Sequence, residues 1–246
     1  MELSRREYAA DVLANAKHFL QRNSALKPPR PFIIEFTGPP LSGKTTLIDG
    51  LDNYLRHEKF SVQRPQEGAE VFRHISRETP HYNLTTAAYA LRNVMEAVYS
   101  SDHDFVLLDR GLYDAHPWME YWKSKKKLSE HDALRFQLFF THPLMVSEID
   151  LCFFVFCSPE EAGRRKQKSS PELYGDAGGS YTSPESLRKL SEIFSRSCDI
   201  LQADLKPVAR IDTTDLQKPA MYDAAIEKLL PSIAARSFSQ KTQFTP

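Results

Sequence analysis

The segment from Gly38 to Thr45, GPPLSGKT, constrains this chain more than any other, because it satisfies every fixed position of the pattern G-x-x-x-x-G-K-[S/T]. It follows the apolar, β-branched segment 32–37 and precedes a stretch, 47–55, with leucine and isoleucine at helical spacing. This strand, loop and helix are the context that the pattern requires. The glycines let backbone N–H groups at the start of the helix face a phosphate. We therefore predict a polyphosphate site at Gly38, Ser42, Gly43, Lys44, Thr45 and Thr46.

The rest of the chain alternates between short apolar segments and amphipathic ones. Strands are expected near 60–64, 105–109, 151–156 and 208–211, and stretches with helical periodicity separate them. Short, continuously apolar strands between helices are typical of a parallel sheet that is covered on both faces. We therefore predict an α/β, three-layer sandwich.

The chain is predicted to form one main domain, 31–236, because no long spacer interrupts it. Residues 1–30 are interpreted as a helical extension, with an amphipathic helix over 5–22, and 237–246 as a polar tail.

Charge and composition exclude several classes of function. The chain has 32 Lys and Arg against 32 Asp and Glu, so no basic face for nucleic acid is expected. No apolar stretch nears the roughly 20 residues of a membrane helix, and a cytoplasmic location without membrane partners is expected. The three cysteines, Cys152, Cys157 and Cys198, lack metal-ligand spacing and are interpreted as buried apolar residues.

Asp109 ends the most apolar predicted strand and is followed by Arg110. The carboxyl ends of parallel strands are where open α/β sheets bind ligands. A carboxylate beside phosphate implies magnesium, and Thr45 and Asp109 are its predicted ligands. Capping of the next turn is the alternative role for Asp109.

Further cations and aromatic residues allow two interpretations each. Arg164 and Arg165 open a cationic, glycine-containing stretch that is predicted to be a lid over the phosphates at about 163–183, and a solvated helix face is the alternative. Arg92 is either a surface residue or a phosphate contact. The aromatic residues at 118, 121 and 122 are interpreted as core, with an aromatic wall for a planar base as the alternative.

These residues, in this order, resemble the thymidylate kinase and deoxynucleoside kinase group of P-loop enzymes over roughly residues 30–235. The group's P-loop resembles Gly38 to Thr45, and its Asp-Arg pair resembles Asp109-Arg110. Its lid arginines, after a Pro-Glu-x-Ala turn, are similar to Arg164 and Arg165 after 158–162. The loop on which such kinases place adenine is similar to 210–214.

The resemblance implies a five-stranded parallel sheet of order 2-3-1-4-5, with ATP and magnesium as cofactors. It implies that Asp212 and Thr213 lie near ATP and that the acceptor contacts Arg92, Arg110 and Tyr113. Thymidylate kinases carry an acidic residue inside the P-loop, where Pro39 to Leu41 stand here, which argues against thymidine monophosphate. Glu67 is similar to the base that nucleoside kinases place after the second strand.

The predicted function is ATP-dependent transfer of the γ-phosphoryl group to a nucleoside, a nucleotide or another small acceptor. The predicted catalytic residues are Lys44, Asp109, Arg110, Arg164, Arg165 and Glu67. A GTPase-like switch is disfavoured, because residues 157–160 replace the guanine-reading Asn-Lys-x-Asp. A P-loop ATPase and a kinase for an antibiotic or similar acceptor remain alternatives. Oligomeric state is left open, with a homodimer as one arrangement.

Overall fold

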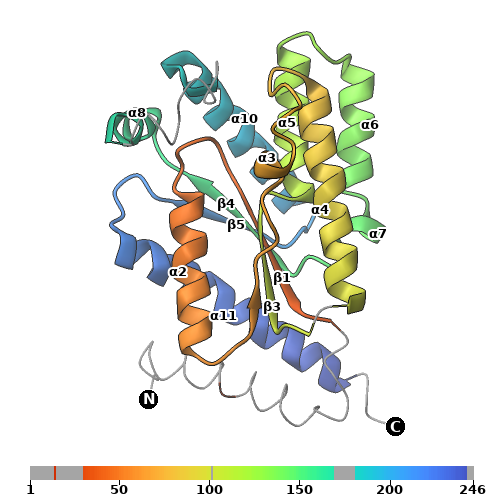
Figure 1. The fold of residues 1–246 in the computed structure, drawn as a ribbon, viewed down its shortest axis with the longest axis vertical. Helices are drawn as coiled ribbons and strands as arrows, with labels where there is room; N and C mark the ends of the chain where they lie inside the picture. Colours follow the sequence, from red (N-terminus) through yellow and green to blue (C-terminus); the bar gives the residue numbers. More distant parts are fainter. Residues whose placement is uncertain (1–13, 15–29, 101, 169–180, 243–246) are drawn as a thin grey trace.

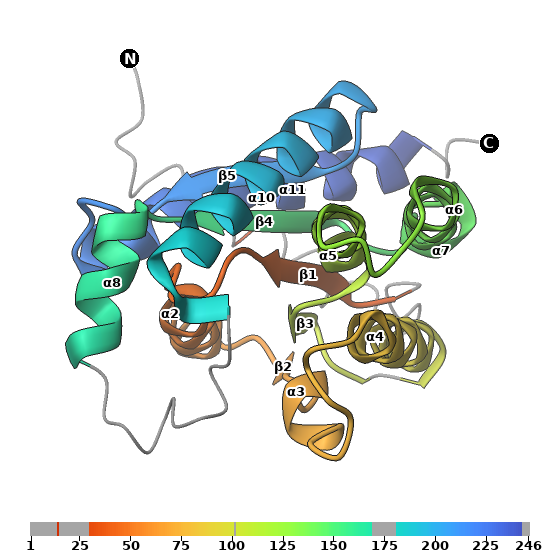
Figure 2. The ribbon, with the colours of Figure 1, turned by 90° about the horizontal axis from the view of Figure 1, so that it is seen from above.

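The computed structural model describes residues 14, 30–100, 102–168 and 181–242. Its centre is a five-stranded parallel sheet of order β2-β3-β1-β4-β5, as predicted (Figures 1 and 2). The strands are β1 (Phe32–Thr37), β2 (Val62–Gln63), β3 (Phe105–Asp109), β4 (Leu151–Phe156) and β5 (Val208–Asp212). Each strand lies where the apolar pattern predicts one.

The register of the central strands sets the position of the functional loops. β1 lies between β3 and β4, and Phe36 on β1 is opposite Asp109 on β3. The chain therefore leaves β1 for the loop that begins at Gly38 at the level where Asp109 ends β3. Parallel pairing brings both ends to one edge of the sheet.

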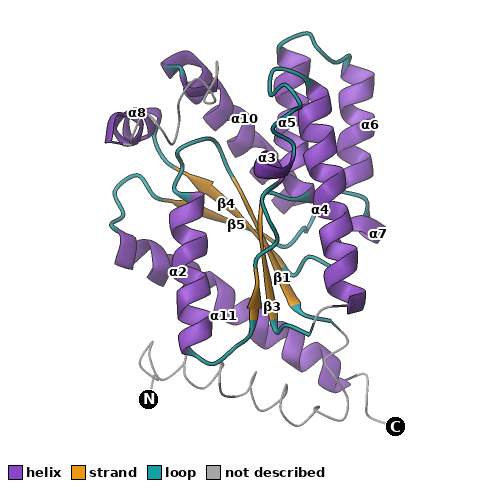
Figure 3. Cartoon of the chain, in the orientation of Figure 1, coloured by secondary structure: helices purple, strands orange, loops and turns teal. Residues whose placement is uncertain are grey.

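Helices cover both faces of the sheet (Figure 3). One face is covered by α2 (Lys44–His57) and α11 (Lys218–Thr242), and the other by α4 (Pro80–Ser100), α5 (Leu112–Ser124) and α10 (Pro184–Ala203). The remaining helices are α3 (Gly68–Val71), α6 (Glu130–Phe140), α7 (Pro143–Val146) and α8 (Pro159–Lys168). The architecture is thus the predicted three-layer sandwich.

The alternating side chains of β1 belong to two separate cores. Ile34 and Phe36 pack with Leu47 and Leu51 of α2. Ile33 packs on the other side, with apolar residues of α5 and α10. Trp118, Tyr121 and Trp122 are buried in this second core, as the core interpretation predicted, and the three cysteines are buried and free.

Some predictions fall on residues that are not described. The amphipathic helix at 5–22, the end of the tail at 243–246, and 169–180 of the predicted lid lie outside the described residues. Residues 163–168 belong to α8. The division into extension, domain and tail stays a prediction. None of the described helices has both the length and the apolar character that a membrane span requires.

Candidate functional site

The loop from Gly38 to Thr45 joins β1 to α2, and two of its residues must be glycine. Gly38 has φ +152° and Gly43 has φ +94°, a region that side chains disfavour. A Cβ atom at Gly38 would also lie 2.1 Å from the carbonyl oxygen of Val155. The loop therefore curls tightly against β4 and ends at the N-terminus of α2, where backbone N–H groups lack partners within the helix.

Lys44 is the buried cation of this loop. Its Nζ atom donates to the carbonyl oxygens of Gly38 at 3.2 Å and Pro39 at 3.3 Å, and only 8% of the residue is exposed. Burial, together with the charge of Arg110, lowers the pKa of Lys44 to about 8. A bound phosphate group would add a negative charge to those of Asp109, Asp114 and Glu67, which already favour the charged form of Lys44.

The hydroxyl groups of the loop differ in exposure. The Ser42 hydroxyl is buried and has no hydrogen-bond partner among the described residues. Thr45 is exposed and Thr46 is half-buried at the start of α2. The exposed Thr45 hydroxyl is thus open to a ligand at the helix N-terminus.

Asp109 ends β3 with a free carboxylate oxygen. Its Oδ1 atom is buried, and no described residue donates a hydrogen bond to it. Burial raises the pKa of Asp109, and the charge of Lys44 opposes this rise. No described group of three or more His, Cys, Asp or Glu could cage a metal ion. Asp109 and Thr45 therefore fit a magnesium ion held mainly by phosphate and water.

Arg110 follows Asp109 with a backbone conformation that is rare for a non-glycine residue, φ +66°. Its N–H donates to the Phe36 carbonyl at 2.9 Å, and its Nη1 atom donates to both carboxylate oxygens of Asp114 at 3.1 Å. Its Nε atom lies 3.6 Å from a carboxylate oxygen of Glu67. Two carboxylates therefore hold and neutralise this guanidinium.

β1 supplies two polar residues to this arrangement that the sequence analysis missed. The Thr37 hydroxyl donates to Asp114 Oδ1, and the Glu35 carboxyl accepts hydrogen bonds from the first turn of α5. Glu35 interrupts an otherwise apolar strand sequence, and Asp114 follows Arg110 at the helical spacing of four. These two features were signals that could have revealed the network.

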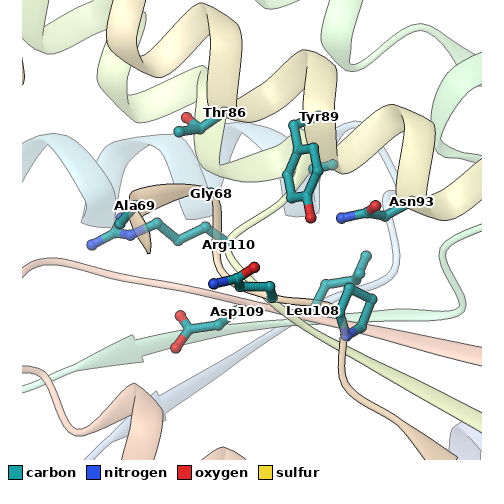
Figure 4. Close-up of a pocket in the computed structure, with 11 residues that line it drawn as sticks. Gly68, Ala69, Thr86, Tyr89, Asn93, Leu108, Asp109 and Arg110 are labelled. Atoms are coloured by element: carbon teal, nitrogen blue, oxygen red, sulfur yellow. The ribbon is translucent and has the colours of Figure 1, made fainter. Parts of the chain in front are cut away.

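A small pocket lies beside Asp109 and Arg110, between α4 and the segment that connects β2 to α3. Tyr89 and Asn93 point into it from α4 (Figure 4). It is lined by Pro65, Gln66, Gly68, Ala69, Thr86, Tyr89, Ala90, Asn93, Leu108, Asp109 and Arg110. Several of these side chains were missed, because no motif marks polar residues scattered along a helix.

Glu67 lies between two residues that line the pocket, Gln66 and Gly68, immediately before α3. Burial raises its pKa, and the neighbouring charge of Asp109 raises it further. A carboxylate with a raised pKa next to a pocket has the chemistry of a general base.

Only one of the two predicted lid arginines contacts the phosphate loop. Nη1 of Arg165 donates to the Leu41 carbonyl at 3.1 Å and to the Thr213 hydroxyl at 3.0 Å, and Nη2 donates to the Thr213 carbonyl at 2.8 Å. Arg164 is largely exposed and pairs with Glu161 at 3.0 Å. Arg165 therefore lies at the predicted ATP site, and Arg164 points away from these contacts.

Residues 210–212 of the predicted adenine loop, 210–214, belong to the end of β5, and only Thr213 and Thr214 follow the strand. The Thr213 hydroxyl is within 2.8 Å of the Ser42 carbonyl and 2.9 Å of the Phe156 carbonyl, so this loop is tied to the phosphate loop. Asp212 is exposed and accepts hydrogen bonds from the N–H and hydroxyl groups of Thr214.

Two predicted acceptor residues lie away from the pocket lining. Arg92 is on the exposed side of α4 and pairs with Glu96 at 3.0 Å. Tyr113 is fully buried in the α5 core, and its hydroxyl has no hydrogen-bond partner within the described part of the chain. Of the three predicted acceptor contacts, Arg110 alone lines the pocket.

Comparison with known proteins identifies the class of fold. No protein-family model matches the chain, and no curated protein matches its sequence. Among solved structures, a deoxyadenosine kinase from M. mycoides with bound dCTP is similar, with a TM-score of 0.53 and 15% identity. The match covers 80% of this chain and 98% of that chain. The chain has the fold of the P-loop kinases.

Proposed function

We propose that this chain is an ATP-dependent kinase that transfers the γ-phosphoryl group of ATP to a hydroxyl group of a small molecule. One observation carries the proposal: Asp109 lines a pocket and also has a free carboxylate oxygen beside the buried cation of the phosphate loop. A pocket that shares this residue with the phosphate site suits a second substrate. A simple ATPase needs only water there.

The residues of the phosphate site take distinct roles in this proposal. Lys44 neutralises charge on the β- and γ-phosphates, and the N–H groups of the loop orient them. Arg165 holds the phosphate loop and the loop at Thr213 together around ATP. Thr45 and Asp109 would hold a magnesium ion, which would supply positive charge that neutralises the phosphates.

The base for the acceptor hydroxyl is proposed to be Glu67. Its raised pKa and its place beside the pocket make it a proton acceptor that is close to Arg110. Because phosphoryl transfer depends mainly on positioning and charge neutralisation, this base contributes less than Lys44.

The acceptor is proposed to be uncharged, such as a nucleoside or a similar alcohol. Arg110 is the one cation among the described residues that line the pocket, and Asp114 and Glu67 already balance it. A phosphate on the acceptor would require unpaired cations, since burying an unpaired charge is costly. Gln66, Tyr89 and Asn93 instead offer neutral donors and acceptors.

Labelled ATP with magnesium and a panel of acceptors tests the proposal. The panel contains nucleosides, the matching nucleoside monophosphates and hydroxyl-bearing antibiotics. We expect label on a nucleoside or other uncharged alcohol, and no label with Lys44→Ala. ATP hydrolysis at one rate with every compound and with none would instead identify an ATPase. Preferred labelling of the monophosphates would show that the acceptor is charged, which would contradict the proposal of an uncharged acceptor but not the proposed kinase activity.

A further inference from the structure

Glu35 is a fully buried acidic residue in the middle of β1. Its neighbours Ile34 and Phe36 pack in the core beside α2, whereas Glu35 faces α5 from the opposite side of the strand. An acidic side chain in an apolar environment is costly unless specific partners compensate for the lost water. The partners of Glu35 therefore indicate why the chain tolerates it.

Both oxygens of Glu35 contact the beginning of α5. Oε2 accepts a hydrogen bond from the N–H of Tyr113 at 3.2 Å, and Oε1 accepts one from the N–H of Asp114 at 2.9 Å. N–H groups in the first turn of a helix have no partner within that helix. Glu35 thus supplies, from the sheet, the hydrogen bonds that α5 lacks at its N-terminus.

Gly111 provides the space that Glu35 occupies. A Cβ atom at position 111 would lie 2.4 Å from the carboxyl carbon of Glu35. This contact excludes a larger residue at position 111 unless Glu35 moves. The glycine that follows Asp109 and Arg110 therefore leaves room for the Glu35 carboxyl.

Asp114 links Glu35 to the pocket, because it contacts both Glu35 and Arg110. Glu35 holds the N–H of Asp114, and Thr37, two residues further along the same face of β1, donates to its carboxylate. The same carboxylate accepts both hydrogen bonds from Nη1 of Arg110. A single strand thus fixes the backbone and the side chain of the residue that orients Arg110.

We propose that Glu35 is a positioning residue for phosphoryl transfer, which fixes the first turn of α5 and thereby sets, through Asp114, the position of the Arg110 guanidinium at the pocket. This inference rests on the proposed function, because it assigns a role within that reaction. Glu35 itself lies too deep to touch a substrate. A misplacement of about 1 Å in a catalytic arrangement is enough to reduce a rate roughly a hundredfold.

The protonation and the hydrogen bonds of the Glu35 carboxyl decide how much of this role each substitution keeps. Burial raises its pKa to about 8, the charge of Asp114 adds to the rise, and the backbone N–H groups of residues 112–114 oppose it. Asp114 and Tyr113 of α5 and Cys152 of β4 are the titratable groups that face it. Glutamine has the same length and no charge, but its one carbonyl oxygen can accept from only one of the two N–H groups, and its NH2 group, a donor, faces the other. Alanine leaves both buried N–H groups unpaired.

The test begins with the free protein. The rate of hydrogen exchange with solvent is measured by NMR for the Arg110 Nε–H and for the backbone N–H groups of Tyr113 and Asp114. The proteins compared are wild type, Glu35→Gln and Glu35→Ala. Ile34→Ala is the matched control, because Ile34 is equally buried but faces the other core. We expect exchange at least about tenfold faster in Glu35→Ala, a smaller increase in Glu35→Gln and no increase in Ile34→Ala. Gly111→Ala, which crowds Glu35 from the other side, should act in the same way and replaces Glu35→Ala if that variant fails to fold.

Kinetics with the nucleoside that wild type phosphorylates fastest complete the test. Glu35→Ala should lower kcat at least about tenfold with less than about threefold change in the KM for ATP, and Glu35→Gln, which keeps one of the two acceptors, should lower it less. Combined with Arg110→Ala, Glu35→Ala should cause no further loss. The positioning role is overturned if hydrogen exchange at Arg110 is the same in Glu35→Ala and wild type. It is also overturned if the reductions in kcat caused by the two single substitutions multiply in the double variant. Changed exchange without transfer by wild type overturns only the proposed function.

Discussion

Arg165 on α8 donates a 3.1 Å hydrogen bond to the carbonyl oxygen of Leu41 in the phosphate loop. Leu41 has φ +65°, so this bond holds a residue in an unfavourable backbone conformation. The same guanidinium also contacts Thr213 and pairs with Glu161 at 3.0 Å. A helix outside the sheet thus helps to shape the loop that is predicted to bind phosphate.

Arg165→Ala is expected to weaken catalysis much more than Arg164→Ala. Loss of the bonds to Leu41 and Thr213 should lower kcat/KM for ATP at least about tenfold, since a hydrogen bond from a charged group contributes about 1.5–3 kcal/mol. Arg164 shares Glu161 with Arg165 but is largely exposed, which makes it the matched control. Steady-state kinetics of both variants test this prediction. Equal kcat/KM for ATP in the two variants would show that Arg165 has no role at the ATP site.

Lys44→Ala should abolish transfer without preventing folding. Loss of the cation that neutralises the phosphates should lower kcat at least about a hundredfold, or several kcal/mol of transition-state stabilisation. Circular dichroism and thermal unfolding check the fold. Lys228→Ala removes an exposed lysine of α11 and serves as the control. Near-normal turnover in Lys44→Ala would exclude this loop as the ATP site.

Asp109→Asn should raise the magnesium concentration needed for half-maximal activity. The amide keeps the shape of the side chain but removes the negative charge that attracts the cation. Activity is measured over a magnesium titration at saturating ATP, with Asp215→Asn, an exposed residue after β5, as the control. The same magnesium dependence in Asp109→Asn and wild type would assign Asp109 another role, such as base or acceptor contact.

Glu35 should make the stability of the fold depend on pH. Its folded-state pKa of about 8 lies above the ordinary value of 4.5. Between these values the unfolded chain releases a proton that the folded chain retains, so the free energy of unfolding should fall by about 1.4 kcal/mol per pH unit as pH rises. This effect should level off above pH 8. Urea unfolding of wild type and Glu35→Gln at pH 5, 6.5 and 8 measures it.

In Glu35→Gln this contribution of Glu35 is absent, so its stability relative to wild type should increase with pH over that interval. Glu192→Gln, at an exposed position of α10, should follow wild type. A constant difference between Glu35→Gln and wild type at all three pH values would contradict the raised pKa.

The sequence alone determined the elements that depend on local pattern. The β1 and β3 segments were predicted at their observed bounds, because continuously apolar runs need burial on both faces of a sheet. The glycines at 38 and 43 were predicted because a phosphate loop requires their backbone conformations. The strand order followed from the resemblance to known kinases and was confirmed.

Only the tertiary structure decided how side chains from distant segments combine. Arg92 and Asn93 are neighbours on α4, yet helical rotation turns one to solvent and the other into the pocket. Arg164 and Arg165 are separated in the same way, and no local pattern indicates which one meets Leu41. Glu35 looked like an exception in an apolar strand, because its partners lie almost 80 residues away on α5. A buried acidic side chain can be understood only once the groups that compensate for its lost water are known.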